Sequence, residues 1–138
     1  MISLPIKHIK LSILIPSIPS RFDRVKELVG QLEGQIGGRD DVEIIVFMDN
    51  KKRSIGRKRN DIMKLATGQY FSMIDDDDNV SVDYVETLCD VISKYNVDVI
   101  TFDSIAHINN QMGIVNMSIF NEENEQWSPN KITKRQPF

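Results

Sequence analysis

Two neighbouring stretches of this chain carry side chains that can do chemistry. Residues 75–78 are four consecutive aspartates directly after the apolar run 69–74, and residues 51–59 hold six Lys and Arg side chains with no acid. Carboxylate oxygens are preferred ligands of Mg²⁺ and similar hard cations, whereas Lys and Arg bind phosphate oxygens. Together the two stretches favour a site for a nucleoside diphosphate that is held through a divalent cation.

The aspartate block has two other interpretations, a solvated acidic turn and a calcium-binding loop of the EF-hand type. Counted from Asp75, acidic or amide side chains occupy positions 1, 3, 5, 9 and 12 of such a loop. Position 6 is Val80, however, where the sharp turn needs glycine. The residues leading into the block are strand-forming rather than helical. We therefore expect no EF-hand.

The elements that must position these residues follow from the apolar pattern. Apolar runs rich in β-branched residues predict strands at 11–15, 42–48, 69–74 and 97–102. Helical spacing predicts helices from Ser20 to Ile36, at about 55–67 and from Ser81 onward. The order βαβαβαβ predicts an α/β fold of Rossmann-like type. In it a mostly parallel sheet has helices on both faces and right-handed crossovers.

Local signals set the expected helix ends. Ser20 with Asp23 three residues later fits a capping box that opens the first helix. Gly68 is expected to end the second helix, and Ser81 to cap the third.

The predicted strands end in polar residues, and ligands of open parallel sheets bind at that edge. These residues are Ser17, Asp49, the aspartates 75–78 and Asp103. The basic stretch 51–59 leaves the same edge. Taken singly, Asp49 suits an ordinary turn, Asp103 is more typical of a turn than of a ligand, and 51–59 suits a solvated loop or a nucleic-acid patch. Their joint placement favours the phosphate and cation site.

The remaining residues add a hairpin and a polar tail. Apolar segments on either side of "NNQMG" predict a β-hairpin within 104–120 that contains His107. Residues 121–138 are polar and lack clear periodicity. We see no internal repeat and no linker. We therefore expect one domain over 1–138, with a βαβαβαβ core at 1–103.

Composition excludes several classes of protein. The chain has 138 residues, 41% hydrophobic and 27% charged, which fits one globular domain with a real core. A net charge of −3 argues against a protein that coats nucleic acid. The single cysteine, Cys89, excludes an internal disulfide and a cysteine zinc cluster, and its helical apolar neighbours predict a buried, inert thiol.

The expected location is cytoplasmic. The apolar run after Lys10 is too short for a signal peptide, and no small-residue cleavage site follows cleanly. No run approaches the length that spans a membrane.

Three motifs in order carry a resemblance to a known family. They are Gly56-Arg57-Lys58-Arg59-Asn60, Ala66-Thr67-Gly68-Gln69-Tyr70 and Asp75-Asp76-Asp77-Asp78, and they follow strands ending in Pro-Ser and in aspartate. Over roughly residues 10–103 the chain resembles the nucleotide-binding half of family 2 glycosyltransferases with the A-type fold. The resemblance implies transfer of a sugar from a UDP- or GDP-sugar to an acceptor hydroxyl.

The same resemblance implies a role for each matching residue. Ser17 would lie in the base and ribose pocket, Asp49 would contact the nucleobase, and Arg59 would help to hold the nucleotide. Asp75 and Asp76 would belong to the nucleotide-sugar site, with Asp75 facing the ribose or the sugar. Asp77, with Asp78 beside it, would bind Mn²⁺ or Mg²⁺. Because alternate residues of an extended segment point the same way, we expect Asp75 and Asp77 to face one ligand and Asp76 to be dispensable.

Two departures from the family pattern affect these expectations. The chain between Asp49 and Gly56 is shorter than in the family, so we expect the basic stretch to replace part of the phosphate contact. The family's general base lies beyond the aspartate motif, where Glu122, Glu123 and Glu125 read as solvated. We therefore expect the acceptor half to be missing and turnover to be weak or absent. The alternatives are a non-catalytic binding module of the same fold and a nucleic-acid binder acting through 51–59.

Overall fold

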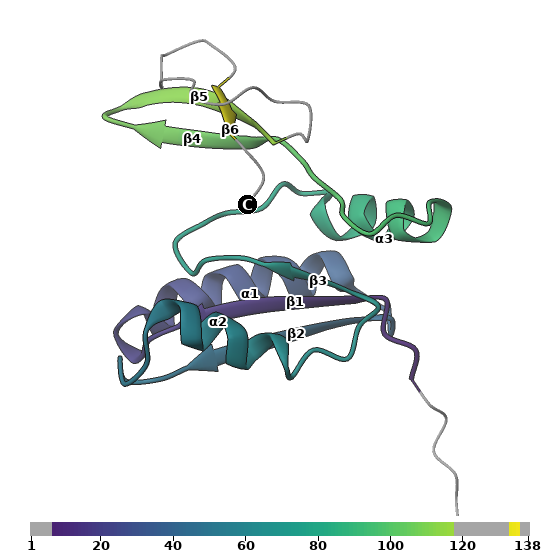
Figure 1. The fold of residues 1–138 in the computed structure, drawn as a ribbon, viewed down its shortest axis with the longest axis horizontal. Helices are drawn as coiled ribbons and strands as arrows, with labels where there is room; N and C mark the ends of the chain where they lie inside the picture. The colour runs from purple at the N-terminus through teal and green to yellow at the C-terminus, as the bar shows by residue number, and fades with distance from the viewer. Residues whose placement is uncertain (1–6, 118–132, 136–138) are drawn as a thin grey trace, which may run out of the picture. The chain divides into compact units, whose positions relative to one another are not determined.

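The computed structural model describes residues 7–117 and 133–135. They belong to two compact units, Met1–Asn96 and Val97–Phe138. Each unit has one three-stranded sheet among the described residues (Figure 1). The α/β prediction is confirmed, with a parallel sheet in the first unit and a hairpin in the second.

The sheet of the first unit has β1 (Leu11–Ser17) between β2 (Val42–Met48) and β3 (Tyr70–Met73). Both neighbours run parallel to β1, which pairs residue for residue with β2 from Leu11 to Ser17. Every residue of β1 is buried, as expected for an apolar central strand that is covered on both faces. The equally apolar β2 is only half buried because it lies at the edge of this sheet.

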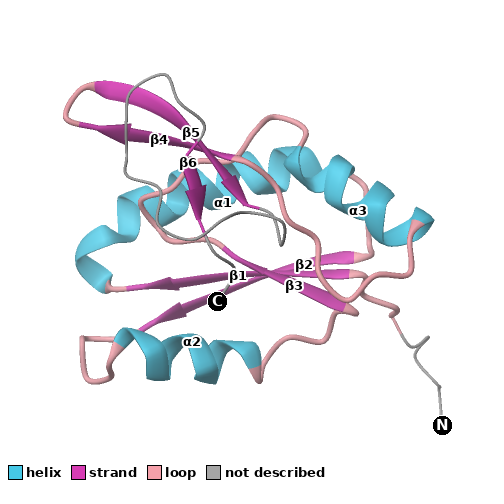
Figure 2. Ribbon diagram, turned by 45° about the horizontal axis from the view of Figure 1, so that its top comes forward, coloured by secondary structure: helices cyan, strands magenta, loops and turns pink. Residues whose placement is uncertain are grey.

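Three helices cover the sheet of the first unit. They are α1 (Phe22–Ile36), α2 (Ile55–Met63) and α3 (Tyr84–Lys94). Figure 2 shows α1 and α3 on one face and α2 on the other. Val25, Leu28 and Leu32 of α1 and Val85 and Cys89 of α3 are buried at helical spacing, which confirms the predicted stripes and the buried thiol. Burial raises the pKa of the Cys89 thiol, in keeping with an unreactive side chain.

The predicted helix ends are partly wrong. Ser20 does not cap α1, because Pro19 first opens a short 3₁₀ helix, η1 (Pro19–Arg21), and Arg21 is the cap position without a side-chain bond. Ser81 does not cap α3 either, because α3 begins at Tyr84 and its cap position is Asp83. Ser81 contributes its carbonyl, which accepts from the N–H of Tyr84. At α2 the cap is Ser54, whose hydroxyl accepts from the N–H of Arg57 at 3.3 Å.

Gly68 does not end α2, which already stops at Met63. Instead, Gly68 lies against β1, and its N–H donates to Ser12 Oγ at 2.8 Å. A Cβ at this position would lie 2.7 Å from Ser12 Oγ and 2.8 Å from Ser12 N. Glycine is needed here for a close approach of the backbone rather than for a helix end.

The predicted fourth strand at 97–102 is also wrong, because the structure assigns no strand there. Val97, Val99 and Phe102 are 38%, 71% and 49% exposed, so this segment is not covered on both faces as a buried strand would be. An apolar pattern indicates which residues favour a strand, but whether a strand forms depends on packing against neighbouring strands. The boundary between the two compact units falls after Asn96.

The second unit contains the predicted hairpin. β4 (Ser104–Ile108) and β5 (Gln111–Met117) pair antiparallel, and His107 lies in β4. Asn109 and Asn110 form the two-residue turn, with φ of 50° and 62°, as in a type I′ turn. A short strand, β6 (Thr133–Arg135), pairs parallel with β5 inside the predicted tail. Its three polar residues carry no periodic signal.

Two expectations about the whole chain have separate outcomes. The single-domain organisation of 1–138 stays a prediction. Within the described part of the chain, no helix is both long enough and apolar enough to cross a membrane.

Candidate functional site

The polar residues that follow the strands of the first unit lie at one edge of its sheet. Ser17 is the last residue of β1, and Asp49 directly follows β2 and donates its N–H to the Ser17 carbonyl at 3.4 Å. After β3, Ile74 donates its N–H to the Leu14 carbonyl at 2.9 Å, so the aspartates begin beside the end of β1. The predicted convergence of Ser17, Asp49 and the aspartate block at the carboxyl edge is therefore present.

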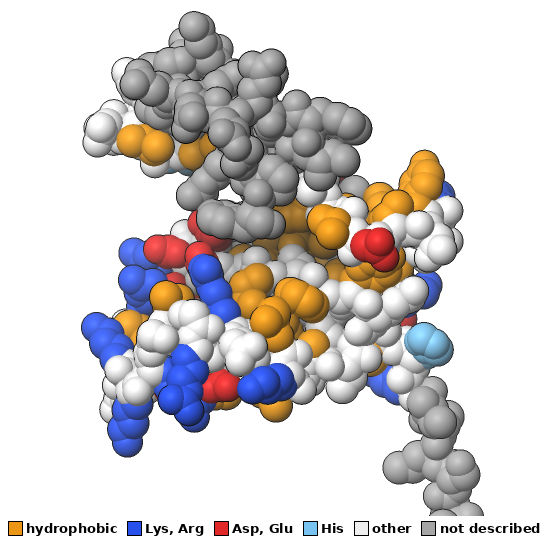
Figure 3. All heavy atoms as spheres, viewed as in Figure 1, with side chains coloured by type: hydrophobic (Ala, Val, Ile, Leu, Met, Phe, Trp, Pro, Cys, Tyr) orange, Lys and Arg blue, Asp and Glu red, His pale blue; other side chains and the backbone are white. Residues whose placement is uncertain are grey.

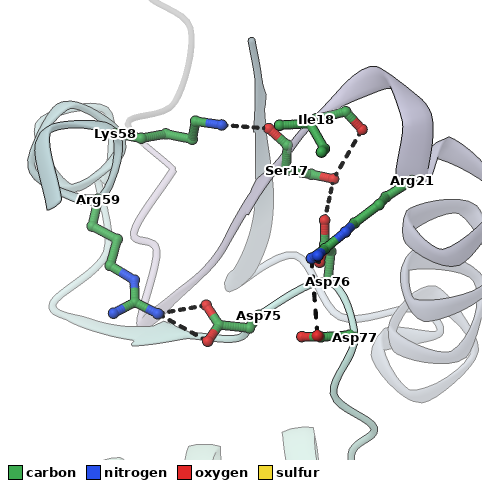
Figure 4. A network of polar contacts seen from close by, with 8 residues as sticks. All are labelled: Ser17, Ile18, Arg21, Lys58, Arg59, Asp75, Asp76 and Asp77. Atoms are coloured by element: carbon green, nitrogen blue, oxygen red, sulfur yellow. Dashed lines mark hydrogen bonds and ion pairs between the residues drawn. The ribbon is translucent and has the colours of Figure 1, made fainter. Parts of the chain in front are cut away.

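Asp76 is the buried member of the aspartate block. Its side chain is 4% exposed, and it accepts hydrogen bonds from Ser17 Oγ at 2.6 Å and from Arg21 Nη1 at 2.7 Å (Figure 4). Burial alone would raise the pKa of the Asp76 carboxyl, but these two hydrogen bonds outweigh it and hold the pKa below its usual value. These contacts give Asp76 a structural role, because they tie the end of β1 to the start of α1. The expectation that Asp76 is dispensable for nucleotide binding stays a prediction.

Asp75 and Arg59 form the second contact at this edge. Arg59 extends from α2 and donates through Nη2 to both oxygens of Asp75, at 2.7 and 2.9 Å (Figure 4). Both side chains are 43% exposed, so the pair is open to solvent. The Nε of Arg59 is buried and has no hydrogen-bond partner among the described residues. Arg59 thus keeps an N–H that can donate a hydrogen bond to a ligand oxygen.

Asp49 and Ser17 are joined through Lys58. The Lys58 ammonium donates to the Ser17 carbonyl at 2.7 Å and lies 2.5 Å from Asp49 Oδ1. Its side chain is only 4% exposed, and Figure 4 shows it reaching from α2 toward the end of β1. The contact with Lys58 holds the pKa of the Asp49 carboxyl below its usual value. Asp49 is therefore an ionised side chain in a sheltered position.

Asp77 and Asp78 are exposed and lie beside Asp75. The side chain of Asp77 is 49% exposed, and its Oδ2 lies 3.9 Å from Arg21 Nη1. The pKa of the Asp78 carboxyl is raised by loss of surrounding water and by the negative charges of Asp75 and Asp77. The three carboxylates thus repel one another, which favours a cation among them.

These carboxylates also provide the test of whether a divalent metal fits. Among the described residues, no group of three or more His, Cys, Asp or Glu side chains is arranged to hold a metal alone. Mg²⁺, however, is usually held by one or two carboxylates together with substrate phosphates and water. Asp77 and Asp78 supply the right oxygen donors for such a shared site, so the donor set fits.

The basic stretch 51–59 divides between structural and exposed roles. Lys58 is buried, and Arg53 lies 5.0 Å from the Phe47 ring centroid and 3.4 Å from Asp61 Oδ2. Lys51, Lys52 and Arg57 are exposed. Figure 3 shows Lys and Arg side chains gathered over the part of this face where α2 lies. The stretch is therefore neither a uniform solvated loop nor a uniform basic patch.

Two site residues were missed from the sequence. Arg21 lay at the predicted start of the first helix, close to the edge that the strand ends defined, and this position was the available signal. Lys58 lies four residues before the buried Ile62, so both occupy the inner face of α2. That spacing was a signal that the lysine points inward.

The other residues named from the sequence do not belong to the first unit. Asp103 belongs to the second unit, where it precedes β4. Glu122, Glu123 and Glu125 lie outside the described residues.

Comparison with known proteins gives one clear match. The family model described as "Glycosyl transferase family 2" matches residues 19–137, which is most of the chain. Neither the curated proteins nor the solved structures give a significant match. The matched range contains Asp49, Arg59 and all of the aspartates 75–78, whereas Ser17 lies just before it.

Proposed function

Because the chain belongs to glycosyl transferase family 2, we propose that it binds a nucleotide-diphosphate sugar, a UDP- or GDP-sugar, through Mn²⁺ or Mg²⁺. The observation that carries this proposal is the acidic group Asp75, Asp77 and Asp78 between Arg21 and Arg59. It follows a parallel strand at the carboxyl edge, where α/β sheets bind ligands. The mutual repulsion of these carboxylates favours a cation, and the arginines complement a diphosphate.

The residues of this edge have separate proposed tasks. Asp49 accepts a hydrogen bond from the nucleobase, while Ser17 and Asp76 form the floor beneath the base and ribose. Arg59 gives its unused Nε–H to a phosphate oxygen. Asp75 faces the ribose or the sugar, and Asp77 and Asp78 hold the metal. The bound cation would neutralise charge on the diphosphate leaving group.

The further step, which is also proposed, is transfer of the sugar to an acceptor hydroxyl. The acceptor must lose a proton as it attacks, so a carboxylate base is required beside it. None of the described residues is assigned that role. Donor binding is therefore the core of the proposal.

Calorimetric titration with UDP and with GDP, with and without Mn²⁺, tests donor binding. We expect at least one nucleotide to bind at least about tenfold more tightly with Mn²⁺. The Asp77→Ala variant should lose this metal dependence. Asp40→Ala, an exposed acid next to the amino-terminal end of β2, is the matched control and should leave it unchanged. If neither nucleotide shows metal-dependent binding, the proposed function is wrong.

A non-catalytic binding module of the same family is the second candidate. Its support is that none of the described residues at the carboxyl edge is assigned the role of a general base. Hydrolysis of a UDP- or GDP-sugar, or transfer of the sugar to a hydroxyl acceptor, measured as release of free UDP or GDP, separates the two. Metal-dependent binding with no such release under any condition would favour the module.

A further inference from the structure

Lys58 is a buried cation that joins three elements at the site. It leaves the middle of α2, is 3% exposed, and contacts the end of β1 through the Ser17 carbonyl and the residue after β2 through Asp49. A buried ammonium is unfavourable unless it is paired. The Asp49 carboxylate and the Ser17 carbonyl therefore supply the partners that the buried Lys58 ammonium needs.

Asp49 retains acceptor capacity despite this pairing. Its side chain is 14% exposed, and both carboxylate oxygens are buried and accept no hydrogen bond of good geometry among the described residues. The Lys58 ammonium, with smaller contributions from the Lys51 N–H and the Arg53 charge, lowers the pKa of Asp49. An ionised carboxylate has several acceptor sites and no donor. The Asp49 carboxylate can therefore accept a hydrogen bond from a ligand but cannot donate one.

We propose that Lys58 is a positioning residue for nucleobase recognition: it keeps Asp49 ionised and aimed at the base edge. This inference rests on the proposed function. A fixed acceptor favours a base that presents an N–H between two oxygen or nitrogen groups, as uracil does at N3 and guanine at N1. It disfavours cytosine and adenine, which present a lone pair at the corresponding ring nitrogen. A site built around a hydrogen bond rejects an analogue that leaves it unpaired.

A purely structural lysine would behave differently. If Lys58 only held α2 against the sheet, its loss would weaken the binding of every nucleotide by a similar factor. A positioning lysine instead controls the difference between two bases. UDP and CDP are suitable probes because they share the ribose and the diphosphate and differ only at the pyrimidine edge.

The experiment measures the dissociation constants of UDP and CDP, with Mn²⁺ present, for the wild type and for Lys58→Met. We expect the wild type to bind UDP at least about tenfold more tightly than CDP. Without its cation, the buried Asp49 takes up a proton and becomes a donor. The ratio in Lys58→Met should then fall to about threefold or less, mainly because UDP binding weakens.

Two further variants separate folding from recognition. In the Asp49→Leu and Lys58→Met double variant, apolar side chains replace the whole pair, an exchange that is often neutral for stability. The circular dichroism spectrum of the double variant should match that of the wild type. Its affinities for UDP and CDP should be nearly equal. Lys58→Arg restores a permanent cation and should recover at least part of the ratio.

Two outcomes would overturn the inference. One is a wild-type UDP/CDP ratio in Lys58→Met, which is also what equal weakening of UDP and CDP would give. The other is a wild-type UDP/CDP ratio in the folded double variant. Each leaves metal-dependent donor binding by the wild type intact, so each is distinct from a failure of the proposed function. A wild type that binds no nucleoside diphosphate overturns both.

Discussion

Four identical residues occupy three kinds of environment in this protein. Asp75 faces Arg59 in an open pair, Asp76 is buried under Ser17 and Arg21, and Asp77 and Asp78 face solvent. Alternation along an extended segment would pair Asp75 with Asp77 on one side. The chain turns here instead, because the N–H of Asp78 donates to the carbonyl of Asp75 at 3.0 Å. The turn gives Asp76 a buried position that the simple alternation did not predict.

Replacement of Asp76 should therefore affect stability more than replacement of its neighbour. Asp76→Ala removes the acceptor of the buried Ser17 hydroxyl and of Arg21, and we expect a loss of about 1–3 kcal/mol in the free energy of unfolding. Asp77→Ala, at a half-exposed position, should cost about 0.5 kcal/mol or less. Urea unfolding at pH 7 measures both values. Equal losses in the two variants would contradict the buried role of Asp76.

At the scale of the elements, Glu43 links β2 to β1 and to the loop before β3. Its Oε1 accepts from Ser12 Oγ of β1 at 2.6 Å and from the N–H and hydroxyl of Thr67 at 2.8 and 2.9 Å. Burial alone would raise the pKa of the Glu43 carboxyl, but these hydrogen bonds lower it below its usual value. Glu43 thus stabilises the sheet through its hydrogen bonds and does not belong to the candidate site.

This arrangement predicts a specific loss of stability in acid. A carboxyl whose folded pKa is depressed stabilises the fold above its unfolded pKa of about 4.3, and this contribution disappears as the pH falls through the lower folded pKa. Glu43→Gln should therefore be less stable than the wild type by about 1–2 kcal/mol at pH 7. The difference should shrink toward zero in strong acid. Urea midpoints from pH 7 down to pH 2.5 measure it, and a constant difference would contradict the linkage.

Gly68 provides the second prediction at this scale. In Gly68→Ala the new Cβ would meet the Ser12 backbone N at 2.8 Å, and backbone cannot move aside as a flexible side chain can. We expect a loss of about 1–3 kcal/mol. Gly34→Ala is the matched control, because Gly34 lies in the exposed interior of α1 with nothing within 4 Å. That change should stabilise the protein by about 0.5–1 kcal/mol.

Thermal unfolding distinguishes these two glycines in one experiment. The melting temperature should fall for Gly68→Ala and rise for Gly34→Ala. An unchanged melting temperature for Gly68→Ala would mean that β1 and the loop before β3 separate at little cost.

At the scale of the whole molecule, the candidate site is contained in one unit. Ser17, Arg21, Asp49, Lys58, Arg59 and the aspartates 75–78 all belong to Met1–Asn96. They come from segments on both sides of the central strand, so a ligand at this edge would hold β1, β2 and α2 together. Binding of donor and metal should therefore be coupled to the stability of this unit.

The expected result is a shared stabilisation by nucleotide and metal. A ligand at about 100 times its dissociation constant stabilises the native state by about 2.7 kcal/mol. We expect UDP or GDP with Mn²⁺ to raise the melting temperature by several degrees, more than the sum of the nucleotide alone and Mn²⁺ alone. Differential scanning fluorimetry measures the three conditions, and strictly additive shifts would argue against a shared site.

The sequence by itself determined the class of fold, three of the parallel strands and their helices, the hairpin and the edge that gathers the site. These features depend on apolar periodicity and on turn residues. Both signals are contained in short stretches of the sequence. The motifs Gly56–Asn60 and Asp75–Asp78 likewise indicated the family that the matching model identifies. The proposed tasks of the individual residues stay predictions.

Tertiary structure alone decided how the polar groups are paired. Lys58 and Asp49 are nine residues apart and Ser17 and Asp76 are 59 apart, so no local rule connects them. The absence of a strand at 97–102 and the close approach at Gly68 also depend on which backbone edge is near. The physical reason is the same in each case. Hydrogen bonds and ion pairs act over a few ångströms in space, and the chain brings distant residues within that range only when it folds.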